Sequence, residues 1–542
     1  MGNIRKKSWI ALAGLGVVFV AILGRLYYLV QKQPADVAST QSRWAVTVAN
    51  TRGTIYDCHR IPLVNDTKEY RAALLPDAAL LNKVYSATAP ADFAALREKL
   101  QTGAPATVKL TKPIGISDGI RLFYVPVRYG ARLLTPHVIG YLDAEGSHGV
   151  TGIEASCDSL LNEYAGTASV TFAVDGSGTC LNGIPPAVTN TLSRSAGGVM
   201  LTIDRDIQQA VEDLAPDYLP KGAVIVMDPY TGAIRAMASF PSYQPSTVAD
   251  VISDGDGALV NRALALFDCG SVFKTVTASA ALEAGMSVDS IFTCPGGLDV
   301  SGTVFHCHNR LGHQRMTMKE AYAQSCNLYF IQLAEQIGGG TLHAMADNFG
   351  FGQAITLTDS LKTPQAVLPT AEELALSPAA LANFSFGQGR LMASPLHIAR
   401  MICAVVNNGV MPMPYLIEAT VSEDGSITES ERVLGSTLIT PAAATTLRSM
   451  MESVITDGTG KRAAPTLCHA AGKTGTAETG QIGGEESVVQ SWFAGYFPAE
   501  NPRYVITVLA EDANNTGGQS AAYFSALADA LYTMKLPSAE TP

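Results

Sequence analysis

The longest apolar stretch of the chain lies at its start. Residues 9–30 are apolar and interrupted only by Arg25, which gives about the length of helix that spans a bilayer. The basic segment Arg5-Lys6-Lys7 precedes this stretch and indicates a cytoplasmic N-terminus. We therefore expect a cytoplasmic tail at 1–8 and a single transmembrane anchor at 9–30. A cleaved signal peptide is the alternative, but no small-x-small cleavage pattern follows closely.

The region from residue 31 to about 200 reads as short strands and loops. One clear helical pattern lies near 91–101, and a second helical stretch begins after Gly149 and runs to Tyr164. No constellation of catalytic residue types stands out here. We expect residues 31–200 to form a strand-rich, non-catalytic pedestal domain.

The pattern changes after residue 200. Asp204 precedes a helical pattern over 207–214, and two apolar runs at 223–227 and 233–237 flank a turn and predict an antiparallel hairpin. A helix-rich block follows. Three strand candidates and a final amphipathic helix come last, at 473–477, 491–496, 504–510 and 519–534. Strands at both ends of a helical middle predict one antiparallel sheet, and hence an α+β domain over 201–536 with a tail at 537–542.

Composition and charge narrow the function classes. The chain has 542 residues, of which 47% are hydrophobic and 16% are charged, a globular composition. The net charge is -11, and no long basic block follows the N-terminus, so nucleic acid is not an expected partner. The nine cysteines are an odd number, and a chain of this size does not need a disulfide framework.

One loop gathers residue types that suit zinc: Cys294, His306, Cys307, His308 and His313. Their spacing matches no standard zinc finger, so we prefer an ordinary polar loop and expect no metal. A disulfide between Cys294 and Cys307 is the cysteine pairing that the sequence favours most, and it stays open.

Three short motifs each occur once, in a fixed order: Ser271-Val-Phe-Lys274, Ser325-Cys-Asn327 and Lys473-Thr-Gly475. Any one of them arises easily by chance; the first alone would be an ordinary helix cap, and the second alone leaves a helix cap and a site equally open. Together, on a chain with an expected membrane anchor, they indicate acyl transfer through a serine ester.

The first motif supplies a nucleophile and a base. An apolar helical pattern follows Ser271, which places it at a helix N-terminus, and Lys274 lies one turn on along the same face. A lysine can act as a base if burial and a second cation lower its pKa, and Lys473 is the expected second cation.

The second motif is expected at a short connection between two helical stretches, facing the same cleft. The hydroxyl of Ser325 can relay a proton to a leaving amine. The amide of Asn327 can bind a peptide group through both its donor and its acceptor.

The third motif reads as a strand that passes close to a substrate. Lys473 and the hydroxyls of Thr474 and Thr476 would attract a carboxylate, and Gly475 leaves room for a substrate backbone. The backbone N–H groups of Thr476 and Ser271 could form an oxyanion hole. A phosphate-binding loop is rejected, because Leu467 stands where such a loop needs glycine.

These motifs and several other segments resemble those of class B penicillin-binding proteins, the peptidoglycan D,D-transpeptidases. The further segments are Arg52-Gly53, Asp57, Gly149-Val-Thr-Gly152-Ile-Glu154, Asp228-Pro-Tyr-Thr-Gly232, Asn261-Arg-Ala263, Phe386-Gly-Gln-Gly389, Ser394-Pro395, Gly458-Thr-Gly460 and Gly472-Lys-Thr-Gly-Thr-Ala477. One departure lies beside the nucleophile, where the family often has proline and this chain has Cys269.

The resemblance implies a transpeptidase domain with a five-stranded antiparallel sheet flanked by helices, similar to serine β-lactamases. It implies that Ser271 is acylated, that Lys274 is its base, and that Ser325 relays the proton. It also implies a set of substrate-binding residues: Asn327, Lys473, Thr474, Gly475 and Thr476.

The function that follows is the cross-linking of peptidoglycan stem peptides ending in D-Ala-D-Ala, with release of terminal D-Ala and no cofactor. The resemblance further implies acylation by β-lactams, an extracytoplasmic catalytic domain on the cell membrane, and partnership with a membrane glycan polymerase and a wall-synthesis complex. A β-lactam-hydrolysing or β-lactam-sensing protein and a catalytically inert scaffold are the alternatives. The process served (elongation, division or sporulation), the acceptor amine and the oligomeric state stay open.

Overall fold

The computed structural model describes residues 2–32, 43–117, 119–255, 257–483, 486–513 and 518–534. The chain divides into two compact units. The first unit comprises Met1–Arg52, Thr67–Arg128 and Ala165–Arg194, and the second comprises Gly53–Asp66, Tyr129–Tyr164 and Ser195–Pro542. Two segments before residue 165 therefore belong to the unit that carries the three motifs, although the sequence suggested a boundary near 200.

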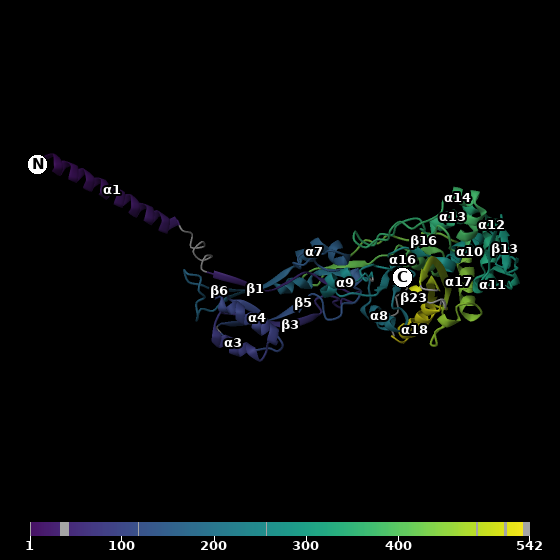
Figure 1. Ribbon diagram of the computed structural model, residues 1–542, viewed down its shortest axis with the longest axis horizontal. Helices are drawn as coiled ribbons and strands as arrows, with labels where there is room; N and C mark the ends of the chain where they lie inside the picture. Colours follow the sequence, from purple (N-terminus) through teal and green to yellow (C-terminus); the bar gives the residue numbers. More distant parts are fainter. Residues whose placement is uncertain are drawn as a thin grey trace. The chain divides into compact units, whose positions relative to one another are not determined.

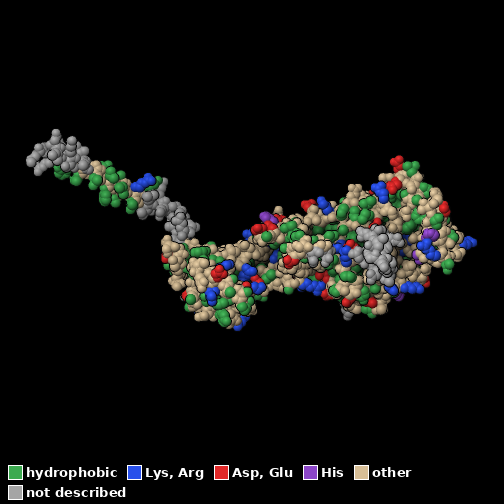
Figure 2. Space-filling view, in the orientation of Figure 1, with side chains coloured by type: hydrophobic (Ala, Val, Ile, Leu, Met, Phe, Trp, Pro, Cys, Tyr) green, Lys and Arg blue, Asp and Glu red, His purple; other side chains and the backbone are tan. Residues whose placement is uncertain are grey.

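Helix α1 (Gly2–Lys32) contains the apolar stretch expected to cross the membrane. Its described side chains from Leu12 to Tyr28 are exposed, and Figure 2 shows hydrophobic side chains along it. In the part of the chain that the structure describes, however, no helix combines the length and the hydropathy needed to cross a membrane. The structure thus does not bear out the transmembrane span expected at 9–30.

Beyond α1, the described part of the first unit contains two small antiparallel sheets and the helices α3 and α4. One sheet has the order β1-β6-β7 and the other the order β4-β3-β5. Their strands are β1 (Arg43–Thr51), β6 (Gly166–Ala173), β7 (Ala187–Asn190), β3 (Thr67–Leu74), β4 (Ala106–Leu110) and β5 (Ile120–Val127). Helices α3 (Ala78–Tyr85) and α4 (Pro90–Gln101) share their core, and α4 confirms the helical pattern seen near 91–101.

The second unit is organised around a five-stranded antiparallel sheet with the order β10-β9-β23-β22-β21. One of its strands, β23, is labelled in Figure 1. Its strands are β9 (Gly222–Met227), β10 (Ile234–Phe240), β21 (Ala471–Gly483), β22 (Glu486–Phe497) and β23 (Tyr504–Ala513). The hairpin and the three late strands predicted from the sequence are confirmed. As predicted, distant parts of the chain meet in one sheet.

Both faces of this sheet are covered, which explains why every residue of β9 is buried. Val224 and Val226 lie in one core with α8 (Arg205–Tyr218) and α18 (Gln519–Thr533). Ile225 and Met227 point to the opposite core, which includes residues of the helices α10 (Lys274–Glu283), α16 (Pro395–Val406) and α17 (Pro441–Thr456). The alternation of a strand thus places two helical layers on one sheet.

The helices near the sheet begin where the sequence signals them. The side chain of Asp204 accepts hydrogen bonds from two backbone N–H groups at the start of α8. Further helices of the middle block are α11 (Met318–Ala323), α12 (Asn327–Ile337), α13 (Gly339–Asn348), α14 (Ala371–Leu376) and α15 (Pro378–Ser385). Shorter helices and turns elsewhere in this unit are α5 (Pro136–Ile139), α6 (Gly152–Ser156), α7 (Asp158–Glu163) and α9 (Val248–Asp254).

Small sheets complete the second unit. A four-stranded sheet has the order β19-β18-β8-β2, formed by β2 (Thr54–Tyr56), β8 (Gly198–Leu201), β18 (Ile417–Val421) and β19 (Ile427–Glu429). Two-stranded pairs join β11 (Phe267–Asp268) to β16 (Met392–Ala393), β12 (Phe292–Cys294) to β15 (Gln314–Met316), β13 (Gly297–Val300) to β14 (Thr303–His306), and β17 (Val410–Met411) to β20 (Ser436–Thr437). The pairs β12–β15 and β13–β14 lie in the chain between α10 and α11, directly before the second motif.

Candidate active site

The three motifs meet in one cluster, as the sequence predicted. Ser271 lies in a 3-10 turn (Gly270–Phe273), and Lys274 is the first residue of α10, which continues from that turn. The side-chain nitrogen Nζ of Lys274 lies 3.0 Å from Ser271 Oγ. The nucleophile and its expected base are therefore in direct hydrogen-bond contact.

The second motif surrounds the same amine. Lys274 Nζ lies 2.6 Å from Asn327 Oδ1, 2.7 Å from the carbonyl oxygen of Ser325 and 3.2 Å from Ser325 Oγ. A neutral amine has two N–H donors and one lone pair. If it donates to its two nearest acceptors, the carbonyl of Ser325 and the amide oxygen of Asn327, its lone pair is left for the proton of Ser271.

The third motif approaches from the sheet. Lys473 Nζ donates to Ser325 Oγ at 3.0 Å and to the carbonyl oxygen of Thr474 at 3.0 Å. The hydroxyl of Ser325 thus lies between the amines of Lys274 and Lys473, where it can pass a proton.

Both lysines are fully buried, and this sets their protonation. Burial lowers the pKa of the Lys274 amine from 10.5 to about 7, because the charged form loses its hydration. Burial and the nearby charge of Lys274 lower the pKa of Lys473 well below 10.5. Burial therefore lowers the pKa of Lys274 into a range where the neutral amine is present near pH 7. The sequence predicted that Lys473 would lower the pKa of Lys274, but the charge effect acts on Lys473 instead.

A glycine allows the nucleophile turn to lie against the sheet. Gly270 has a φ of +57°, and a Cβ added there would lie 2.6 Å from the carbonyl oxygen of Thr476. The preceding Cys269 is buried with a φ of -77°, a value that proline also adopts. The departure from proline at this position therefore leaves the backbone path unchanged.

The connection that carries Ser325 has an unusual backbone. Ser325 has a φ of +52°, in the left-handed region that non-glycine residues rarely adopt. The next residue, Cys326, occupies the N-cap position of α12, and its side chain makes no capping hydrogen bond. Neither Ser325 nor Asn327 is the helix cap that the motif alone would suggest. The hydrogen bond from Lys274 to the Ser325 carbonyl helps to hold this strained connection.

Strand β21 forms the edge of the sheet beside the nucleophile. Along it, Lys473 is buried, Thr474 is half-buried and Thr476 is exposed. A Cβ added to Gly475 would lie 3.0 Å from Val272 Cγ1, so this glycine lets the strand lie against the nucleophile turn. This contact joins two parts of the same chain. The expectation that Gly475 also leaves room for a substrate backbone stays a prediction.

Thr459 joins the site although the sequence did not single it out as a site residue. Its hydroxyl lies 2.7 Å from the hydroxyl of Thr474 and its backbone N–H donates to the carbonyl of Ala323. The sequence pointed to this position only through the segment Gly458-Thr-Gly460, which resembles a segment of the family. A Cβ added to Gly458 would lie 2.1 Å from the same carbonyl of Ala323, so the glycine is required by the approach.

Comparison with known proteins agrees with this geometry. Residues 222–529, more than half of the chain, match the penicillin binding protein transpeptidase domain. The chain is similar to penicillin-binding protein PbpB of Mycolicibacterium smegmatis, with 33% identity over 422 residues that cover 73% of this chain and 62% of that protein. It therefore spans less than two thirds of the length of this relative.

Two further proteins match over most of their length. The peptidoglycan D,D-transpeptidase FtsI homolog of Mesostigma viride is 27% identical over 541 residues, which cover 91% of this chain and 89% of that protein. The structure of penicillin-binding protein 3 from Mycobacterium tuberculosis complexed with aztreonam matches with a TM-score of 0.64 and 26% identity, covering 90% of this chain and 97% of that one. Ser271 lies beside the buried amine of Lys274, near that of Lys473, and the second unit carries a five-stranded sheet. The chain belongs to the penicillin-binding protein transpeptidase family.

Proposed function

We propose that this protein is a peptidoglycan D,D-transpeptidase that works through a serine acyl-enzyme. One observation carries the proposal. Lys274 Nζ lies 3.0 Å from Ser271 Oγ, in a buried environment that lowers the pKa of this amine to about 7. A serine beside an amine that is neutral near physiological pH has the arrangement of a nucleophile and its general base.

Acylation proceeds in steps that the geometry supports. The neutral amine of Lys274 takes the proton of Ser271, and Oγ attacks the carbonyl carbon of the penultimate D-Ala. The backbone N–H groups of Ser271 and Thr476 stabilise the developing oxyanion. The peptide bond then breaks, the Ser271 ester remains, and the proton reaches the leaving amine of D-Ala through the hydroxyl of Ser325.

The substrate is held by the edge of the sheet. Its terminal carboxylate binds the ammonium group of Lys473 and the hydroxyls of Thr474 and Thr476, and a carboxylate at that place favours the charged form of the lysine. The amide of Asn327 binds the penultimate peptide group. An amine from a second stem peptide attacks the ester, which transfers the acyl group, forms the cross-link and frees Ser271.

β-Lactams act on the same residues in this proposal. Penicillin-binding protein 3 of Mycobacterium tuberculosis, which is similar to this chain, has been crystallised with the β-lactam aztreonam. Because a β-lactam offers a strained amide and a nearby anionic group, it would acylate Ser271 while its anion binds Lys473.

Localisation and partners follow the family. We propose that the chain is held at the cell membrane with the second unit outside the cytoplasm, and that the first unit is a non-catalytic pedestal. A membrane glycan polymerase of the wall-synthesis complex would supply the strands to be cross-linked.

The direct test is labelling of the full chain with fluorescent penicillin, followed by mass mapping of the labelled peptide. The label is expected on Ser271 and absent from a Ser271→Ala variant. Ser287→Ala, which replaces a serine outside the site, is the matched control and should label normally. A label on another residue would refute the assignment of the nucleophile.

The rate of label loss separates the proposal from the hydrolase alternative. A transpeptidase holds the penicilloyl ester for many minutes, whereas a hydrolase releases it quickly. Release of D-Ala from a stem peptide in the presence of an acceptor amine tests the scaffold alternative, because an inert scaffold would release none.

A further inference from the structure

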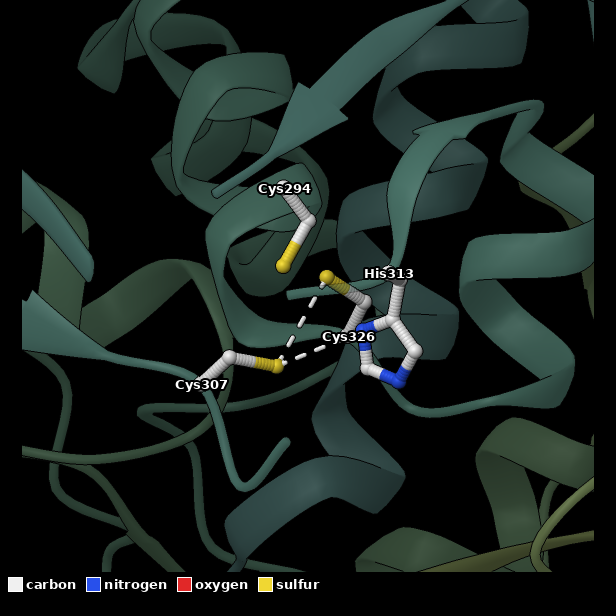
Figure 3. A group of neighbouring side chains, drawn as sticks. All are labelled: Cys294, Cys307, His313 and Cys326. Carbon is white, nitrogen blue, oxygen red and sulfur yellow. Dashed lines mark hydrogen bonds between the residues drawn. The ribbon is translucent and has the colours of Figure 1, made fainter. Parts of the chain in front are cut away.

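Three cysteines and a histidine meet beside the second motif (Figure 3). These are Cys294, Cys307, His313 and Cys326, and one ligand atom of each lies within 4.8 Å of those of the others. The three cysteines are buried and His313 is partly exposed. Figure 3 shows the three sulfur atoms directed toward one another, with the ring of His313 beside them.

The distances fit the edges of a tetrahedron around zinc. Cys307 Sγ lies 3.9 Å from Cys326 Sγ and 3.5 Å from His313 Nδ1. With Zn–S bonds of about 2.3 Å and Zn–N bonds of about 2.0 Å, a tetrahedral site has S···S edges of about 3.8 Å and S···N edges of about 3.5 Å. The sulfur atoms of a disulfide would be only about 2.05 Å apart, and each of these cysteines is a free thiol in the structure.

The backbone brings the four residues together tightly. Cys294 ends β12 and pairs with Gln314 of β15, which directly follows His313. A Cβ added to Gly312 would lie 2.2 Å from the carbonyl oxygen of Cys294, and Gly312 has a φ of +77°, so glycine is needed for this approach. The backbone N–H of Cys307 donates to the carbonyl of Gly296 in the same loop. Three separate segments are thus fixed before any ligand binds.

We propose that Cys294, Cys307, His313 and Cys326 bind one structural zinc ion. Three thiolates and one imidazole are a ligand set that closed zinc sites use. On binding, three S–H bonds break and three Zn–S bonds form, and the three protons leave to solvent. The neutral imidazole of His313 supplies its Nδ1 lone pair. This site replaces the metal-free polar loop, or the Cys294–Cys307 disulfide, that the sequence suggested.

The position of Cys326 gives the ion a role in the site. Cys326 is the middle residue of the second motif, between Ser325 and Asn327, both of which contact Lys274. A Zn–S bond would tie this segment to the β12–β15 loops and would hold the left-handed conformation of Ser325. The residues of the zinc site are therefore positioning residues. This role rests on the proposed function, whereas the binding of zinc does not.

The test begins with metal content. The full chain, purified in detergent without chelators, is expected to carry about one zinc ion per chain by mass spectrometry, with an X-ray absorption spectrum of three sulfurs and one nitrogen. Cys307→Ser should lower zinc affinity more than about 10-fold. Cys468→Ser, a half-buried cysteine elsewhere in the unit, should keep the metal. Undiminished zinc in Cys307→Ser would overturn the proposal.

A second measurement uses the unaltered chain, because Cys307→Ser could fail to fold. Zinc is removed with a chelator and the protein is titrated with Co²⁺, which should produce thiolate-to-cobalt charge-transfer bands and the visible bands of a tetrahedral site. Absence of these bands overturns the proposal. So does a disulfide among Cys294, Cys307 and Cys326, found by mass spectrometry of unreduced peptides. Neither readout depends on acylation, so the zinc site and the proposed function can fail independently.

Discussion

Two clusters of buried side chains share the segment from Ser325 to Asn327, and they prefer ligands of opposite charge. The catalytic cluster contains the amines of Lys274 and Lys473 and is suited to an anion. The second cluster contains the three thiols around Cys326 and is suited to a cation. Because a buried ionic group is costly without a partner, each cluster is completed by what binds to it. In the two proposals, the segment serves the substrate through Ser325 and Asn327 and binds the metal through Cys326.

The largest loss of acylation rate should come from replacing Lys274, the proposed base of the catalytic cluster. Lys274→Met removes the group that takes the proton of Ser271, so the rate of acylation by fluorescent penicillin should fall by about 10²–10⁴-fold. Lys362→Met, on the surface of the same unit, is the matched control and should label at the normal rate. A Lys274→Met variant that keeps its melting temperature and labels within about twofold of the parent would remove Lys274 from the mechanism.

Removing the proposed zinc ion from the second cluster should cause the next largest loss of acylation rate. If zinc holds Ser325 and Asn327 through Cys326, the zinc-free chain should be acylated about 10–100-fold more slowly, as for other groups that orient an active centre. Added zinc should restore the rate, whereas Mg²⁺, which prefers oxygen ligands, should not. An unchanged acylation rate in a chain shown to be zinc-free would separate the two clusters and leave the metal a role in stability alone.

The pH dependence of acylation should distinguish the two clusters, because Lys274 titrates in the first and the zinc-binding thiolates are protonated in the second. Burial depresses the pKa of Lys274 to about 7, and only its neutral form is a base. Acylation should therefore rise as the pH rises through about 7, by about tenfold between pH 6 and pH 8. Zinc content measured at each pH is the control, because acid also releases zinc by protonating thiolates. A rate that follows zinc content and not the titration of a single base would contradict the assignment.

The sequence predicted the catalytic cluster better than the cluster of cysteines and His313, because motif spacing indicates where the catalytic side chains lie. Ser271 and Lys274 belong to a motif whose helical spacing brings both side chains to one face, and Lys473 and Thr474 belong to a strand. A single antiparallel sheet was predictable from strand candidates at both ends of a helical middle, and the resemblance implied its five strands. Burial of Lys274 was the condition that the sequence argument set for its role as a base, and the structure buries this side chain.

The complete cysteine–histidine cluster and the division into two units could not be predicted, because both depend on contacts between segments that are distant in the sequence. Cys326 occupies the variable position of a motif, so the sequence linked it to Ser325 and not to Cys294 or Cys307. The sequence grouped Cys294, Cys307 and His313 in one loop, and the pairing of β12 with β15 brings Cys294 and His313 together. The division into units was equally hidden, because segments 53–66 and 129–164 join the later unit through contacts that no local pattern records.

The smallest effect concerns Thr459, which contacts the catalytic cluster from outside its three motifs. Its hydroxyl lies 2.7 Å from that of Thr474, which is proposed to bind the substrate carboxylate. Thr459→Val keeps the shape and removes this hydrogen bond, worth about 1 kcal/mol, so acylation by a carboxylate-bearing β-lactam should slow by about fivefold. Thr446→Val, a half-buried threonine of α17 whose hydroxyl donates to the carbonyl of Ala442 in its own helix, is the matched control. The methyl ester of the same β-lactam should not respond to Thr459→Val, since it offers no anion to orient. An equal loss with acid and ester would show that the Thr459 hydroxyl acts through its contact with the Ala323 carbonyl and not through the anion site.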